Sequence, residues 1–197
     1  VSGLLAMADE LGRHASAQDH HMATLARAMA EFHSDRLAAC LHRLDSLRHA
    51  EPGPDDRLLA VMHKFQAGVQ QRSGERHAGM AEIDAGLALA DSVRLPMERV
   101  DLLVMKAEFL FDAEANEEAL ALLAKAQRIA ERIGYTRGLC MVRINLGNFR
   151  YAQERWEEAM ADYRSAMDTA TIGGFDLLAE NCANNIGAVA ASAGEFD

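Results

Sequence analysis

All eight histidines of this 197-residue chain lie within its first 77 residues. Imidazole binds transition metals and titrates near neutral pH, so a metal site and a pH sensor are both alternatives for this region. His14 and His21, like His42 and His49, are seven residues apart and share a helical face. A helical metal site normally needs four-residue spacing and a further carboxylate or cysteine ligand. We therefore predict ordinary surface or interface histidines and no bound metal.

Catalytic motifs do not occur in the sequence, which has no glycine-rich phosphate loop, no nucleophile elbow and no cysteine pair at metal-ligand spacing. The carboxylate pairs Glu117-Glu118 and Glu157-Glu158 begin predicted helices, where negative charge favours the helix dipole. The cysteines are widely spaced within apolar patterns and are expected to be reduced core thiols: Cys40, Cys140 and Cys182. We predict that the protein is not an enzyme and needs no cofactor.

The charge of the chain disfavours two classes of partner. The formal net charge is −10, and residues 101–197 carry 9 basic and 16 acidic side chains. Nucleic acids and anionic membrane surfaces are bound largely through lysine and arginine, so we expect neither partner. No apolar stretch approaches the roughly 20 residues that cross a bilayer, and no signal peptide begins the chain. A cytoplasmic protein is expected.

A repeat with a period of 40 residues organises the chain. Residues 117–120 (Glu-Glu-Ala-Leu) reappear as residues 157–160 (Glu-Glu-Ala-Met). The segment 144–147 is answered by 184–187, which places an asparagine and a glycine at corresponding positions. Because small residues recur where helices must approach closely, each unit is predicted to be a pair of packed helices.

Apolar residues fall at three- and four-residue steps throughout the chain, as in Leu102, Met105 and Phe109, and predict an all-α protein of about ten helices. Proline and glycine mark the breaks between units, at Pro52, Pro96 and Gly134 for example. The expected helices are 2–14, 18–33, 36–49, 55–73, 76–93, 97–114, 117–133, 137–153, 157–171 and 176–193.

Residues 137–171 resemble a tetratricopeptide repeat, with small residues at Gly147, Ala159 and Ala166 and aromatic residues at Tyr151 and Trp156. The resemblance weakens towards the N-terminus, and the period exceeds the family's usual 34 residues. It implies a right-handed superhelical solenoid of antiparallel helix pairs, forming a single domain over 1–197. The implied repeats are 18–49, 55–93, 97–133, 137–171 and the incomplete 176–197.

In tetratricopeptide domains the first helices of successive repeats line a concave groove that holds an extended peptide or another helix. By this resemblance, the groove would present Lys64, Phe65, Arg72, Asp101, Met105, Glu108, Asp112, Asn145, Asn148, Tyr151, Asn181, Asn184 and Asn185. Asparagine amides both donate and accept hydrogen bonds, which suits recognition of a peptide backbone. In the alternative, Asn145 and Asn185 simply bond across neighbouring repeats.

The resemblance therefore implies a scaffold that binds a protein or peptide. The long repeat also resembles modules that bacterial signalling proteins place ahead of an output domain, such as a diguanylate cyclase, a kinase or a transcription activator. A regulatory sensor module is accordingly the alternative function. The chain reads as a fragment of a larger protein, and its last helix is expected to expose Ile186, Val189 or nearby residues, which would permit self-association.

Overall fold

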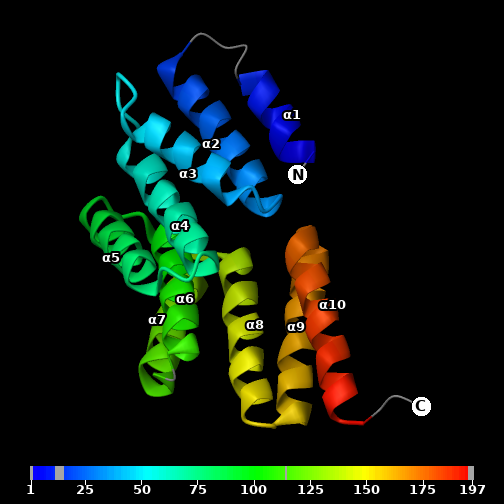
Figure 1. Ribbon diagram of the computed structural model, residues 1–197. Coiled ribbons are helices and arrows are strands. Elements are labelled where there is room, and N and C mark those ends of the chain that lie inside the picture. Colours follow the sequence, from blue (N-terminus) through cyan, green and yellow to red (C-terminus); the bar gives the residue numbers. More distant parts are fainter. Residues whose placement is uncertain (1, 12–15, 114, 195–197) are drawn as a thin grey trace. The chain divides into compact units, whose positions relative to one another are not determined.

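The computed structural model describes residues 2–11, 16–113 and 115–194. Within these ranges the chain forms ten α-helices and no strand (Figure 1). The helices are α1 (Ser2–Leu11), α2 (Ala17–His33), α3 (Leu37–Arg48), α4 (Asp56–Arg72), α5 (Arg76–Ser92), α6 (Pro96–Asp112), α7 (Asn116–Ile133), α8 (Thr136–Ala152), α9 (Trp156–Gly173) and α10 (Asp176–Ser192). From α2 onward their bounds agree with the predicted ranges within two residues, so the all-α prediction is confirmed.

The chain divides into two compact units, residues 1–98 and 99–197, and each is described by itself. In the first unit α2 packs against α1, α3 and α4, and α4 packs against α3 and α5. In the second unit α8 packs against α7, α9 and α10, and α9 also packs against α10. Short turns join these helices, so consecutive helices form antiparallel hairpins, as the repeat predicted.

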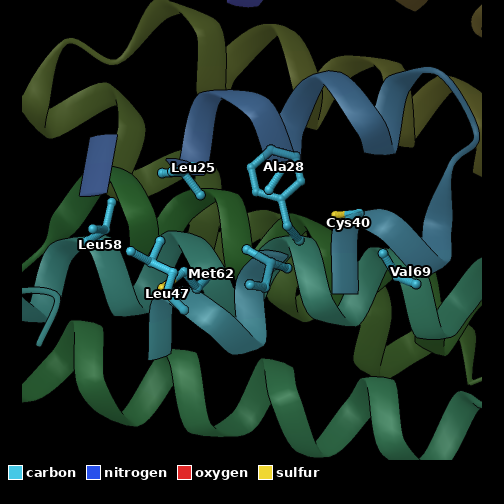
Figure 2. Packing of buried hydrophobic residues seen from close by; sticks show 9 residues of the cluster. Leu25, Ala28, Cys40, Leu47, Leu58, Met62 and Val69 are labelled. Carbon is cyan, nitrogen blue, oxygen red and sulfur yellow. The ribbon is translucent and has the colours of Figure 1, made fainter. Parts of the chain in front are cut away.

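The core of the first unit lies between α2, α3 and α4 (Figure 2). Leu44 and Met62 are almost fully buried there, and Cys40 lies among them as a small apolar side chain. In the second unit, Tyr163 of α9 is 2% exposed and lies against Gly147 of α8. A close approach of this kind needs a residue without a side chain, which explains the glycine at this place in the repeat.

The turns repeat with the same 40-residue period. Each second helix ends at a residue with positive φ: Arg94 (57°), Gly134 (67°) and Gly174 (68°). In all three turns the next N–H donates to the carbonyl five residues earlier at 2.8 Å: Leu95 to Ala90, Tyr135 to Ala130 and Phe175 to Ala170. This hydrogen bond defines a Schellman cap, which satisfies the last carbonyls of a helix. Identical caps at identical spacing confirm the period in the part of the chain from residue 90 to residue 175.

The outer face of α10 differs from the expectation. Val189 is 1% exposed and Ile186 is half-buried, because both pack against α9 and α8. The expectation that α10 would expose Val189 is therefore wrong. The exposed large apolar residues at this end are Leu177 (67%) and Ile172 (90%), beside the turn between α9 and α10. No helix in the described ranges is long and apolar enough to span a bilayer.

Candidate functional site

The first helices of the second unit, α6, α8 and α10, are joined by hydrogen bonds between their polar side chains. Asn145 of α8 donates through Nδ2 to Glu108 Oε1 of α6 at 3.0 Å and to its own helix at Met141 O at 3.1 Å. One period later, Asn185 of α10 donates through Nδ2 to Asn148 Oδ1 of α8 at 3.3 Å. Both bonds join residues 37 positions apart, so the ladder follows the repeat.

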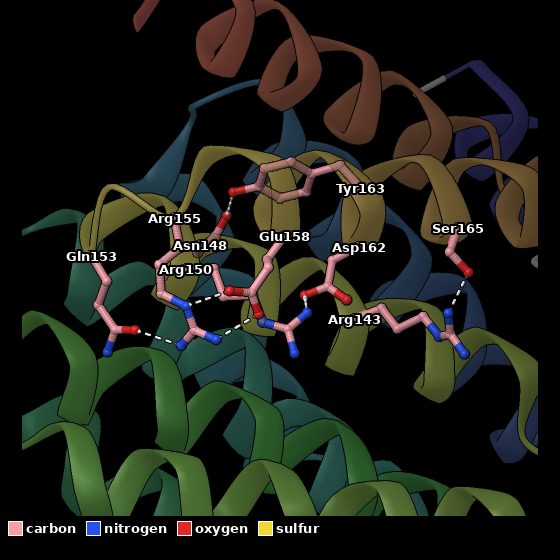
Figure 3. Close-up of polar contacts among 9 residues, drawn as sticks. All are labelled: Arg143, Asn148, Arg150, Gln153, Arg155, Glu158, Asp162, Tyr163 and Ser165. Carbon is pink, nitrogen blue, oxygen red and sulfur yellow. Dashed lines mark hydrogen bonds and ion pairs between the residues drawn. The ribbon is translucent and has the colours of Figure 1, made fainter. Parts of the chain in front are cut away.

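Asn148 is the centre of this ladder. Its Oδ1 also accepts a hydrogen bond of 2.7 Å from the Tyr163 hydroxyl (Figure 3). Asn185 Nδ2 makes a second bond to Asn181 Oδ1 at 3.0 Å within α10. Among the described residues nothing accepts from Asn148 Nδ2, and nothing donates to Asn185 Oδ1. The ladder therefore uses one half of each amide for packing and leaves the other half for a ligand or water.

The remaining predicted groove residues of the second unit have different surroundings. Asn184 is exposed and makes no side-chain hydrogen bond to a described residue. Tyr151 is half-buried; its ring packs on Trp156 with centroids 5.1 Å apart, and its hydroxyl lies 2.8 Å from Ser192 Oγ. Met105 is half-buried, and the side chain of Asp112 lies outside the described part of the chain.

Asp101 is buried at 5% exposure and is held by two residues of the α7–α8 corner. The Tyr135 hydroxyl donates to Asp101 Oδ1 at 2.9 Å, and Arg137 Nη1 donates to Oδ2 at 3.2 Å. Burial and the neighbouring carboxylate raise the pKa of Tyr135 to about 12, so the hydroxyl keeps its proton and stays a donor. This carboxylate ties α6 to the start of α8.

Three predicted groove residues belong to α4 in the first unit and lie beside Phe32 of α2. Phe65 is 8% exposed and meets Phe32 edge to face with centroids 5.4 Å apart. The Arg72 guanidinium lies 4.1 Å from the Phe32 ring centroid and donates to the Phe32 carbonyl at 2.9 Å. Lys64 Nζ lies 5.6 Å from the Phe65 ring centroid. These contacts pack α4 on α2, with both cations over aromatic rings.

Sequence reasoning missed a polar network between α8 and α9 (Figure 3). Arg150 pairs with Asp162 and approaches Glu158 at 3.7 Å, while Arg143 donates to Ser165. Burial raises the pKa of the Asp162 carboxyl despite this arginine. The signal was available, because opposite charges 12 residues apart span a hairpin here and also in the first unit, where Arg43 binds Glu31 through both oxygens.

The histidines form no metal cluster in the described ranges, where no group of three or more His, Cys, Asp or Glu could hold an ion. His14 lies outside those ranges. His63 Nδ1 lies 2.6 Å from Glu82 Oε2 between α4 and α5, and both side chains are largely buried. The three cysteines are buried and unpaired with one another. Burial raises the pKa of the Cys40 and Cys182 thiols to about 11.

Comparison with known proteins supports the fold alone. No protein-family model matches the chain, and no curated protein matches it. Among solved structures, the crystal structure of BtubC (BKLC) from P. vanneervenii superimposes with a TM-score of 0.62, covering 100% of this chain and 91% of that one. The two sequences are 13% identical. The chain therefore has an all-helical fold that is similar to that of BtubC.

Proposed function

We propose that the chain is a tetratricopeptide-type scaffold that binds an extended segment of another polypeptide. The binding face consists of the first helices of the second unit, α6, α8 and α10, with the partner lying across the amide ladder. The observation that carries the proposal is the division of each ladder amide, in which one half joins neighbouring helices and the other half has no partner among the described residues.

A peptide backbone offers alternating N–H donors and C=O acceptors. The ladder offers the complementary set, because Asn148 Nδ2 is a donor without an acceptor and Asn185 Oδ1 is an acceptor without a donor. Asn184 adds a complete exposed amide on α10. Amides recognise backbone groups irrespective of side chains, so the partner is selected by its extended conformation more than by its sequence. Carboxylates at Glu108 and Asp101 favour a neutral or basic partner.

The ladder also joins neighbouring repeats, which was the alternative reading of Asn145 and Asn185. The two roles are compatible, because a side chain held by its neighbour loses less conformational freedom when a ligand binds. Asn145 shows how firmly such a group is held, since it is 6% exposed and makes two hydrogen bonds.

The test uses peptides selected from a random library against the 197-residue chain. Their dissociation constants are then measured for wild type, Asn148→Asp and Asn184→Ala. Asn148→Asp keeps the oxygen that accepts from Tyr163 and removes the unpartnered donor; the preceding repeat already has a carboxylate, Glu108, at this position. Each variant should weaken binding about threefold to tenfold, the effect of one hydrogen bond.

Asn116→Asp is the matched control, because Asn116 is an exposed asparagine at the start of a second helix, α7. It should bind the selected peptides as wild type does. Equal affinities for wild type and both ladder variants would exclude this face as the binding site.

A further inference from the structure

His21 of α2 is a buried polar side chain with no partner. Its exposure is 9%, yet no described residue donates to or accepts from its ring. Other histidines of the same unit are bonded: His20 Nδ1 lies 3.0 Å from Ser16 O, and His49 Nδ1 lies 2.9 Å from Asp45 O. A neutral imidazole has one donor and one acceptor nitrogen, and buried polar groups nearly always have a partner. Water or a ligand must therefore meet the His21 ring.

Two hollows meet at His21, between the first turns of α2 and the loop that joins α3 to α4 (Figure 1). Their volumes are about 370 Å³ and about 260 Å³, and His21 lines both. Glu51 lines the larger hollow and Asp55 lines the smaller one. The two hollows thus form one path past the imidazole with a carboxylate on each side.

The charges around this path are acidic. Neither hollow is lined by lysine or arginine. The arginines nearest in sequence have other partners, since Arg48 donates to Gln66 at 2.8 Å and Arg57 donates to Glu98 at 2.7 Å. Asp55 Oδ1 caps α4 by accepting from Leu58 N at 2.8 Å, and its second oxygen has no partner among the described residues.

Apolar side chains line the same path. Leu47 lies in the larger hollow, and Pro52 and Leu58 lie in the smaller one. A linear ligand with a charge at each end and methylene groups between would match this order of surfaces. An anion would meet two carboxylates, and a metal ion would lack a third ligand among the described residues.

We propose that the His21 hollows bind a short aliphatic diamine. One ammonium group binds Glu51 and the other binds Asp55, while the methylene chain lies over Leu47 and Pro52. The acceptor nitrogen of His21 receives a hydrogen bond from one of the ammonium groups. This site lies in the first unit and is independent of the amide ladder.

The experiment titrates the 197-residue chain, with histidines labelled by ¹⁵N, with 1,4-diaminobutane and records the imidazole resonances. Tetramethylammonium at equal ionic strength is the ligand control, because it has charge and no N–H donor. The His21 resonances, assigned from the spectrum of His21→Gln, should shift and saturate, while those of His49 stay in place.

Variants then test the two carboxylates. Glu51→Gln and Asp55→Asn should each raise the dissociation constant about threefold or more, because each removes a charge-assisted hydrogen bond. Asparagine retains the capping of α4, so Asp55→Asn should fold. Glu75→Gln, an exposed change at the α4–α5 turn, is the matched control and should bind as wild type does.

Three outcomes would overturn the proposal. The first is no saturable shift up to about 10 mM diamine, well above the millimolar range of weak specific sites, which would mean that water alone meets His21. The second is an equal shift with tetramethylammonium. The third is an equal effect of Glu51→Gln and Glu75→Gln, which would mean that the diamine only screens the acidic surface.

Discussion

Replacing Gly147 by alanine should destabilise the second unit through one defined contact. A Cβ at this position of α8 would lie 2.6 Å from Tyr163 Cε1, 2.9 Å from Cδ1 and 3.0 Å from Cζ. The ring cannot withdraw easily, because Tyr163 is 2% exposed and its hydroxyl is bonded to Asn148 Oδ1 at 2.7 Å. The added methyl group must displace the ring and strain this hydrogen bond.

The magnitude follows from two opposing effects. Overpacking a core costs about 1–3 kcal/mol. Alanine in place of glycine within a helix stabilises by about 0.5–1 kcal/mol. The net expectation for Gly147→Ala is a loss of about 1–2 kcal/mol, with overpacking the larger effect. Gly187 occupies the same position one period later and has open space around it, so Gly187→Ala should stabilise by about 0.5–1 kcal/mol.

Urea unfolding followed by fluorescence measures both changes. Trp156 is the only tryptophan and packs in the core of α8, α9 and α10, so its emission reports on the unit that carries both glycines. Opposite signs for Gly147→Ala and Gly187→Ala are expected. The packing of α8 on α9 as described would be refuted by a Gly147→Ala variant as stable as Gly187→Ala.

Further predictions concern titration, turn geometry and thiols. Hydrogen bonds from Arg43 lower the pKa of Glu31, so its stabilisation is present above the ordinary value of 4.5 and is lost as the pH falls through the lowered one; the stability of Glu31→Gln relative to wild type should therefore fall as pH rises through this interval. Burial raises the pKa of Asp162 above 3.8, so the relative stability of Asp162→Asn should rise with pH; urea titrations from about pH 3 to about pH 7 measure both slopes, and slopes of equal sign would contradict the contacts. Arg94→Gly should raise the unfolding free energy by about 0.5–1 kcal/mol, because Arg94 has φ 57° where the equivalent turns have glycine; an unchanged melting temperature would count against it. The three buried cysteines should react slowly with iodoacetamide near neutral pH and quickly in urea, and fast labelling of the folded protein would contradict their burial.

The sequence was sufficient for the helices and the period, because both depend on local chemistry. Apolar spacing and turn residues place each helix, and the glycines at 134 and 174 fall where the chain must adopt positive φ. Gly147 was identified as a contact position from its recurrence. Its partner, the Tyr163 ring, follows from how α9 lies on α8, which no local pattern specifies.

The candidate site was less accessible to sequence reasoning. Register placed Asn145, Asn148 and Asn185 on first helices, yet which amide atoms are occupied depends on distances between helices. Asp101 shared the same helical face in sequence, but Tyr135 and Arg137 bury it at the α7–α8 corner. Because charge pairing across a corner depends on the turn geometry, spacing alone could not separate Asp101 from the ladder.

The most direct test of the proposed binding face uses the six asparagines of the chain, five on α8 and α10 and one, Asn116, at the start of α7. Selective ¹⁵N labelling of asparagine resolves their side-chain amides, and a library-selected peptide is then added. The amide resonances of Asn148, Asn184 and Asn185 should shift with the bound fraction while those of Asn116 stay fixed. Peptide binding that leaves the α8 and α10 amides unchanged, or that shifts only Asn116, would contradict the account.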